Sequence, residues 1–369
     1  MQFTVNQATI TKPLQLLCSV VDRRSALPIL THIRLQISQG QLTMTTTDME
    51  LEMIGQLKVT AEQEGDITVP ARKLLDICRA LPAGAEIHFT LSKEKALLRA
   101  GRSRFNLATL PSDSFPASEG MQYRHQLSIA QSELKGLLDQ TSFAMASEDV
   151  RHYLNGLLLE KKATKLHAIA TDGHRLAHSD ITLSDADTDD YRILLPRKTI
   201  NELSRLLEND DSPVAISANQ QQVMIALPDN QLQLTSKLID GEFPDYQRVI
   251  PVNGDKIVII ERETLRQALS RVAILSHDRH RSLRIQLSEH LLTATVVNQE
   301  QESAEEEIII DYASQPLEIA FNNAYLLDLL SAMPDNEVQL TFSDGNSSVL
   351  ITPAVAQPTR QYVVMPIRL

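Results

Sequence analysis

Apolar residues in the first third of the chain follow two spacings. A helical spacing runs from Thr9 to Arg24 and places Ile10, Leu14, Leu17, Cys18 and Val21 on one face. A strand-like alternation precedes this segment in QFTV and follows it in ILTHIRLQIS, QLTMTTTD and ELEMIGQLKV, with Gly40 and polar turns between the runs. The pattern predicts one strand, one helix and then three strands.

This order of elements recurs along the chain. DITV, a helix over 72–81 and the strands EIHFTLS, KALLRAG and SRFNLATL form the second set. Further helices are predicted near 131–146, 197–208, 262–275 and 321–333. The complete pattern predicts six helices and about 24 strands, an α+β fold in which pairs of helices pack on antiparallel sheets.

Short sequences also repeat at about one third of the chain length. Arg72-Lys73 recurs 125 residues later as Arg197-Lys198, and Leu74-Leu75-Asp76 recurs 252 residues later as Leu326-Leu327-Asp328. This period is far longer than the 20–50 residues of a solenoid repeat, so each copy is a domain. Phe-Pro closes the first two copies at 115–116 and 243–244, which places linkers near 112–124 and 241–255. We therefore predict domains at 1–122, 123–250 and 251–369.

The composition is that of an ordinary globular chain. Of 369 residues, 43% are hydrophobic and 22% charged, and no apolar run reaches the ~18 residues that a membrane span needs. The N-terminus MQFTVNQATITKP lacks the basic and apolar regions of a secretory signal, so we expect a cytoplasmic protein without a membrane partner. Cys18 and Cys78 lie within apolar helical patterns and are expected to be buried thiols.

Charge is unevenly distributed between the predicted elements. The six helical windows contain thirteen basic and eight acidic residues, a net charge of +5, whereas the whole chain carries −12 and the remainder therefore −17. A nucleic-acid-binding protein usually presents a basic surface. A protein with an acidic outside and helices that line a positive interior would have such a basic surface. Basic helix faces that are simply exposed to solvent are equally compatible with the pattern. The helix near 321–333 differs, because Asn322 and Asn323 stand in the places of Arg72 and Lys73.

Residues typical of enzymes do not form a recognisable set. Asp172, His174 and His178 lack further ligands or a nucleophile in a known setting, and His277 with His280 has only the spacing of two ligands on one helical turn. No GxxxxGK[ST] phosphate loop is present. We predict no catalytic residue, no metal and no cofactor. The alternative is a repeat scaffold or a carbohydrate-processing enzyme with no DNA role, which would require paired carboxylates in a pocket and no positive charge on the helices.

Seven segments, in their order and spacing, resemble the bacterial DNA polymerase III beta subunit family, the sliding clamps. They are LPIL (27–30), VPARK (69–73), GRSRF (101–105), YLNG (153–156), ATDGHRLA (170–177), SKLIDGEFPDY (236–246) and YVVMPIRL (362–369). The resemblance covers essentially the whole chain. It implies three clamp domains per chain, each with two helices on antiparallel sheets, and a head-to-tail dimeric ring whose helices line the hole.

The resemblance also implies a function. A homodimeric ring encircles double-stranded DNA without reading its sequence and acts as a processivity factor, not an enzyme. Partners would be the DNA polymerase III alpha subunit, the clamp loader, the 3′–5′ exonuclease-containing polymerase complex, and other polymerases and repair proteins that carry clamp-binding peptides.

Three groups of site residues follow from the family. Backbone contacts to DNA are expected from Arg24, Arg72, Lys73, Arg79, Tyr153, Arg197, Lys198 and Arg205. The peptide groove is expected at Leu154, Thr171, Gly173, His174, Arg175, Leu176, Pro244, Arg248, Val249, Asn346, Ser348, Val363, Met365, Pro366 and Arg368. The dimer interface is expected at Arg102, Arg104, Phe105, Leu107, Ile274, Leu275, Glu300, Glu302 and Glu305, with Glu306 and Glu307 extending the acidic run. Two positions depart from the family pattern: Glu148 replaces a neutral residue beside the pore, and Asn346 replaces an apolar one at the groove rim.

Overall fold

A computed structural model describes residues 1–22, 25–116, 122–183, 189–228, 231–276 and 282–367. These residues contain six α-helices and 25 strands, close to the number expected from the periodicity. Residue contacts divide the chain into two compact units. Unit 1 comprises Met1–Ser132 and Asn201–Leu238, and unit 2 comprises Glu133–Ile200 and Ile239–Leu369.

Unit 1 contains two antiparallel sheets. The smaller has the order β5 (Thr60–Gln63), β1 (Gln2–Asn6), β7 (Glu86–Ser92), β8 (Lys95–Ala100) and β9 (Ser103–Ala108). The larger has the order β10 (His125–Ala130), β15 (Pro213–Ala218), β16 (Gln222–Ala226), β17 (Leu232–Lys237), β4 (Leu51–Lys58), β3 (Gln41–Thr47), β2 (His32–Ser38) and β6 (Gly65–Pro70).

Unit 2 repeats this arrangement with an eight-stranded and a four-stranded antiparallel sheet. The larger has the order β14 (Tyr191–Pro196), β11 (Gly156–Lys162), β12 (Lys165–Thr171), β13 (Arg175–Thr182), β25 (Arg360–Val364), β24 (Val349–Pro353), β23 (Glu337–Phe342) and β18 (Lys256–Glu261). The smaller has the order β21 (Ser303–Ile309), β20 (Leu291–Val297), β19 (Ser282–Ser288) and β22 (Leu317–Asn322).

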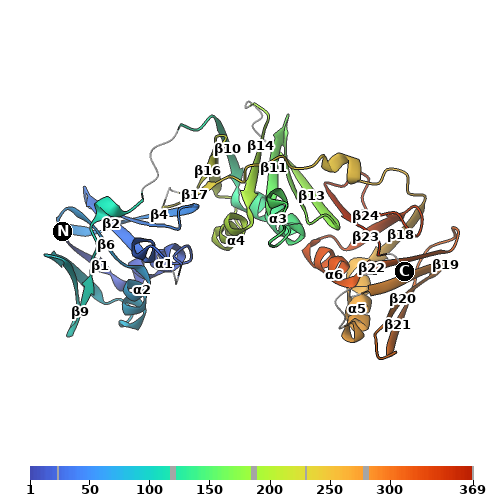
Figure 1. Cartoon of the computed structure of the whole chain (residues 1–369), viewed down its shortest axis with the longest axis horizontal. Helices are drawn as coiled ribbons and strands as arrows, with labels where there is room; N and C mark the ends of the chain where they lie inside the picture. The colour runs from blue at the N-terminus through green and yellow to red at the C-terminus, as the bar shows by residue number, and fades with distance from the viewer. Residues whose placement is uncertain (23–24, 117–121, 184–188, 229–230, 277–281, 368–369) are drawn as a thin grey trace. The chain divides into compact units, whose positions relative to one another are not determined.

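The helices occur in the predicted places. They are α1 (Gln7–Leu17), α2 (Ala71–Ala80), α3 (Gln131–Thr141), α4 (Arg197–Leu206), α5 (Arg262–Val272) and α6 (Asn323–Ala332). α1 packs beside α2 and α5 beside α6, as Figure 1 shows. The boundary between the two units passes through α3 and α4.

The predicted end of the first helix is wrong. α1 begins after Asn6, whose side chain accepts a hydrogen bond from the Ala8 amide at 2.9 Å, but it ends at Leu17 instead of Arg24. Val20 and Val21 are 1% and 3% exposed although they lie beyond the helix, so buried residues in the following turn extended the apolar pattern. Burial alone therefore does not distinguish a helix from the turn that follows it.

The C-terminal strand lies inside the large sheet of unit 2. β25 is hydrogen-bonded on one side to β13 and on the other to β24, so it is not an edge strand. Tyr362 is 1% exposed and its ring lies 6.0 Å from that of Phe143. Removal of this segment would therefore take out an interior strand and disrupt the sheet.

Both eight-stranded sheets continue across the predicted domain boundaries. β17 pairs with β4 through Leu234 and Met53, and β13 pairs with β25 through Leu176 and Val363. No strand occupies the described parts of the segments 112–124 and 241–255, where Phe115 and Phe243 are both 5% exposed. The boundaries after 122 and 250 remain predictions.

Candidate functional site

A cavity of about 200 Å³ opens in unit 2 beside the start of β13. The floor comes from β12, β13 and β25, and the walls come from the short helical turns His152–Leu154 and Tyr246–Val249. Its lining residues are Arg151, Tyr153, Leu154, Thr171, Gly173, His174, Arg175, Leu176, Pro244, Tyr246, Val249, Val363 and Met365.

A tight turn between β12 and β13 shapes one end of the cavity. The Asp172 carboxylate accepts hydrogen bonds from the backbone amides of His174 and Arg175 at 2.9 and 3.0 Å. Gly173 has φ of +88°, and a Cβ atom there would lie 3.0 Å from an Arg151 guanidinium nitrogen. The positive φ therefore favours glycine in this turn, and a larger residue would also displace the flexible end of Arg151.

Arg175 holds this turn against neighbouring elements. Its guanidinium forms ion pairs with Asp172 at 3.1 Å and Asp328 at 2.6 Å and donates to the Phe143 carbonyl at 2.6 Å. The same group lies 4.5 Å from the ring centroid of Tyr325. Because its side chain is only 12% exposed, Arg175 is a structural support of the cavity as well as one of its lining residues.

The end of the chain completes the floor. The Met365 amide donates to the His174 carbonyl at 2.9 Å, and the Ile367 amide donates to the Ala320 carbonyl at 2.7 Å. Val363 is buried, whereas Met365 is 44% exposed at the cavity. A flexible thioether at this position can adapt its shape to different apolar side chains.

Ten of the predicted groove residues surround this cavity. They are Leu154, Thr171, Gly173, His174, Arg175, Leu176, Pro244, Val249, Val363 and Met365. Asn346, Ser348, Pro366 and Arg248 do not line it, and Arg368 lies outside the described residues. The Arg248 side chain is 86% exposed and pairs with Asp245 at 2.9 Å.

Sequence reasoning left three cavity residues out of the groove. Arg151 and Tyr246 were not singled out at all, and Tyr153 was assigned to DNA. The tyrosines lie beside predicted groove residues in YLNG and FPDY, so their proximity was the available signal. Arg151 binds the neighbouring Asp149 carboxylate through two hydrogen bonds of 3.0 Å, which lower the pKa of Asp149 to about 2.

Two arginines predicted to contact DNA have a structural role. Arg72 donates to the carbonyls of Cys18 and Val21 at 3.4 and 3.2 Å, just beyond α1. Arg197 makes equivalent bonds to the Met145 and Ala146 carbonyls at 2.8 and 3.0 Å. These bonds satisfy carbonyl groups after a helix end. Contact of either arginine with DNA remains a prediction.

The third repeat has an asparagine at the start of its second helix. Asn323 is 1% exposed and donates to the Leu269 carbonyl in α5 at 3.0 Å, whereas Asn322 caps α6 by accepting from the Ala324 amide. Leu269 lies inside α5, so Asn323 contacts its neighbouring helix at a different point from Arg72, which bonds to carbonyls beyond the end of α1.

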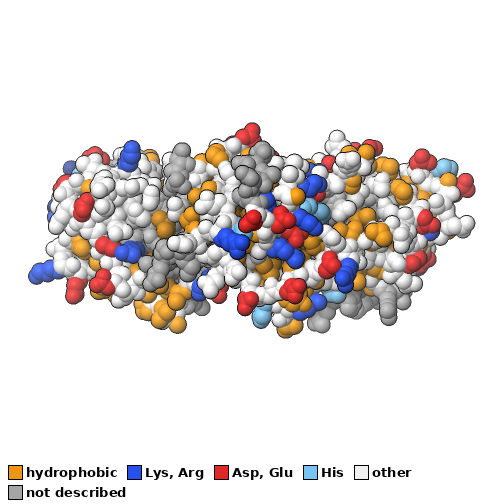
Figure 2. Space-filling model, turned by 90° about the horizontal axis from the view of Figure 1, so that it is seen from above, with side chains coloured by type: hydrophobic (Ala, Val, Ile, Leu, Met, Phe, Trp, Pro, Cys, Tyr) orange, Lys and Arg blue, Asp and Glu red, His pale blue; other side chains and the backbone are white. Residues whose placement is uncertain are grey.

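The remaining candidate DNA contacts differ in their surroundings. Lys73, Arg79 and Lys198 lie on exposed positions of α2 and α4. Arg205 is exposed and pairs with Glu202 at 3.1 Å, and Arg24 lies outside the described residues. Figure 2 shows basic and acidic side chains interspersed on the face that it draws.

The predicted interface residues lie at two sheet edges. β9 carries Arg104, Phe105 and Leu107 at one edge of the five-stranded sheet, with Arg102 in the preceding turn. β21 carries Glu305 at one edge of the four-stranded sheet, and Glu300 and Glu302 precede it. Ile274 and Leu275 lie in the turn after α5, where Ile274 is 65% exposed. Glu306 pairs with Arg271 at 2.7 Å within the same unit.

The candidate enzyme residues are separated in the structure. Asp172 and His174 shape the cavity turn, whereas His178 contacts His167, a residue that the sequence did not single out. His277 and His280 lie outside the described residues. Cys18 and Cys78 are buried free thiols, as predicted, and burial raises their pKa values to about 11 and about 12.

Comparison with known protein families decides the assignment. The DNA polymerase III beta subunit N-terminal, central and C-terminal domain models match residues 1–119, 128–245 and 247–368 in that order. The chain belongs to the DNA polymerase III beta subunit family. Its function is that of a DNA sliding clamp in replication, as the resemblance implied.

Individual clamps are similar over their whole length. The beta sliding clamp of Pseudomonas aeruginosa is 46% identical and that of Escherichia coli K12 is 42% identical, each with full coverage of both chains. The crystal structure of the Pseudomonas aeruginosa sliding clamp bound to griselimycin matches with a TM-score of 0.96, at 46% identity and full coverage of both chains. Among the described residues, none of the helices has the length and apolar character needed to cross a membrane.

Proposed function

We propose that the cavity beside β13 is the groove through which this clamp binds linear peptides of its partners. The observation that carries this proposal is an open apolar cavity of about 200 Å³ whose lining includes ten residues expected from the family. Partners of this groove would be the DNA polymerase III alpha subunit, the clamp loader, and other polymerases and repair proteins.

The chemistry of the cavity suits an extended peptide with apolar side chains. Leu176 and Val363 lie directly opposite each other on β13 and β25 and form a firm apolar floor. Met365 and Val249 are both more than two-fifths exposed at the opening and can be covered by a ligand. Burial of such groups contributes ~25 cal/mol for each Å² removed from water.

A charge introduced at Met365 tests the groove. Met365→Glu should weaken binding of a fluorescent peptide from the polymerase alpha subunit at least about tenfold, because a carboxylate would lose its water in an apolar site. Its backbone bond to His174 can persist, so the fold should be retained. The matched control is Val355→Glu, at a residue 58% exposed outside the cavity lining. Equal peptide affinity of the two variants in fluorescence polarisation would exclude this groove.

We also propose that two copies join into a ring through their edge strands. β9 of one copy would pair with β21 of the other, because each presents an unpaired edge and their exposed charges are opposite. Arg104 on β9 lies directly opposite Arg99 on the neighbouring strand β8, so this edge of the sheet carries two adjacent positive charges, whereas Glu305 and Glu307 are exposed on β21. Ile274→Ala combined with Leu275→Ala should give monomers in analytical ultracentrifugation.

Such a ring would hold duplex DNA by topology and needs few phosphate contacts. Lys73, Arg79, Lys198 and Arg205 are the exposed cations that we assign to the DNA backbone, and Arg24, Arg72, Arg197 and Tyr153 complete the set. Few and interchangeable contacts permit sliding, since each phosphate contact adds affinity and salt dependence. The subunit is then a non-catalytic processivity factor that acts in the cytoplasm and depends on a loader for ATP-driven opening.

A further inference from the structure

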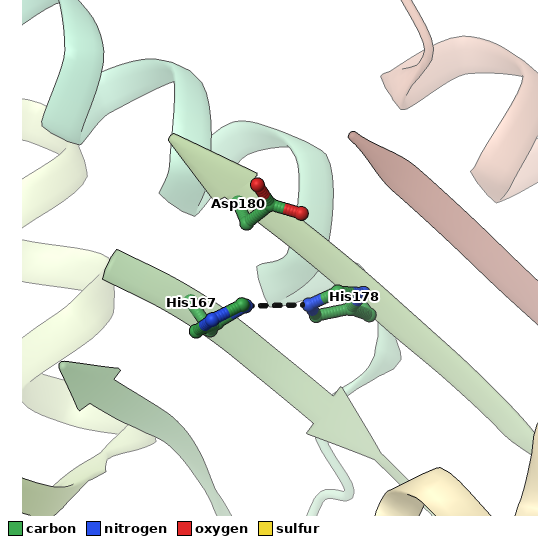
Figure 3. A group of neighbouring side chains, drawn as sticks. All are labelled: His167, His178 and Asp180. Carbon is green, nitrogen blue, oxygen red and sulfur yellow. Dashed lines mark hydrogen bonds between the residues drawn. The ribbon is translucent and has the colours of Figure 1, made fainter. Parts of the chain in front are cut away.

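A row of charged and polar side chains crosses the large sheet of unit 2 near the far end of β13. Arg192, Glu160, His167 and Asp180 are direct register partners on β14, β11, β12 and β13 in that order. His178 lies two residues before Asp180 on β13, so both side chains point to the same face of the sheet. Figure 3 shows His167 and His178 facing each other, with Asp180 beside them.

Three of these residues bring ligand atoms close together. His167 Nδ1 and His178 Nε2 are 3.0 Å apart, and one ligand atom each from His167, His178 and Asp180 lie within 4.8 Å of one another. His178 and Asp180 are both 8% exposed, whereas His167 is half-buried. The group is thus enclosed on one side and accessible to solvent on the other.

The separation of the two imidazole nitrogens fits a shared metal ion. Zn²⁺ binds imidazole nitrogen at ~2.0–2.1 Å, and two such ligands on a tetrahedral ion are therefore about 3.3 Å apart. Their 3.0 Å contact would need to open by only a few tenths of an ångström. A carboxylate oxygen supplies the third ligand of a donor set that first-row transition ions commonly use.

The surroundings of His178 hold its ring in place. Desolvation is the largest effect on this ring and lowers the pKa of His178 to about 4. A hydrogen bond from the Gln361 side chain, on the strand paired with β13, acts in the opposite direction and raises the pKa of His178. The Tyr246 ring lies 5.6 Å from the His178 ring and restricts its rotation.

We propose that His167, His178 and Asp180 form a binding site for a divalent first-row transition metal ion, with Zn²⁺ as the best-matched ion and water as the fourth ligand. Lys165 competes for this position, because its ammonium group lies 2.7 Å from an Asp180 carboxylate oxygen. Its side chain is 46% exposed and can move into solvent when a cation binds. The proposed site lies outside the lining of the peptide cavity and differs from our prediction of no metal, which remains a prediction.

The proposal is tested by Zn²⁺ binding to the full-length, tag-free chain. The chain is first treated with a chelator, which is then removed. Titration calorimetry should show one site per chain, and Co²⁺ in place of Zn²⁺ should give the visible absorption of a four-coordinate ion. His167→Gln should lower the Zn²⁺ affinity more than about tenfold, since loss of a ligand costs at least as much as loss of a residue that merely orients one.

Two further variants make the test decisive. His88→Gln removes an exposed histidine outside the group, where Nδ1 contacts Thr4 at 2.8 Å, and should leave the affinity unchanged. Lys165→Met should raise the affinity, because it removes a positive charge and releases the carboxylate. The proposal is overturned if the chelated chain binds no Zn²⁺, if His167→Gln and His88→Gln bind equally, or if Lys165→Met leaves the affinity unchanged.

Discussion

Leu176 and Asp180 lie four residues apart on one face of β13, and their surroundings differ in kind. Leu176 belongs to an apolar cluster with Leu158, Ile169 and Val363 and borders the peptide cavity. Asp180 is equally well buried but pairs with Lys165 and faces His167. One sheet face therefore supports an adaptable apolar site and an ordered polar group within a few residues of each other.

Tyr246 connects the two regions. Its ring lines the cavity and lies near His178, while its hydroxyl donates to Glu160 at 2.9 Å. Burial is the largest of the effects that raise the pKa of Tyr246 to about 12, so the hydroxyl stays protonated and remains a donor. Polar residues on this face are fixed by mutual hydrogen bonds, whereas the apolar residues leave space for a ligand.

The largest expected effect is on the free energy of unfolding and comes from Arg175, the charged residue that supports the turn at the cavity. Arg175→Ala should reduce the free energy of unfolding by about 2–4 kcal/mol, because it leaves the Asp172 carboxylate, 16% exposed, without its cation. Urea denaturation measures this change. Arg248→Ala is the matched control, since that side chain is 86% exposed and its loss should cost less than ~1 kcal/mol. Similar losses in the two variants would show that Arg175 does not support the turn.

A smaller effect separates the two functions of Tyr246. Tyr246→Phe removes the bond to Glu160 and should lower the free energy of unfolding by about 0.5–1.5 kcal/mol. Peptide affinity should remain unchanged because the ring still lines the cavity. Urea denaturation and fluorescence polarisation on the same preparation check the two effects. A loss of peptide affinity without a loss of stability would show that the hydroxyl serves peptide binding and does not stabilise the fold.

The periodicity of the sequence predicted the number of helices and nearly the number of strands, because each element buries one regular face. It extended the first helix to Arg24, since Val20 and Val21 are buried in the turn that follows the helix. The bonds from Arg72 and Arg197 to distant carbonyls could not be foreseen, because they join residues more than fifty positions apart.

The candidate groove was predicted better than the polar group. Residues of the groove lie in contiguous segments that resemble the clamp family, and ten of them surround the cavity. His167 meets His178 only through the register of β12 and β13, which depends on the turn at Gly173, where φ is +88°. A one-residue shift of that register would point His167 to the other face, so composition and spacing could not reveal the contact.

Retention on circular DNA tests the sliding-clamp function most directly. The labelled chain, loaded by its clamp loader onto a singly nicked plasmid, should co-elute with the plasmid in gel filtration. It should be released when the plasmid is cut into a linear molecule, because a closed ring can slide off free ends. The variant with Ile274→Ala and Leu275→Ala should not be retained on the circle. Equal retention of the wild-type chain on circular and linear plasmid would contradict topological binding and with it the sliding-clamp function.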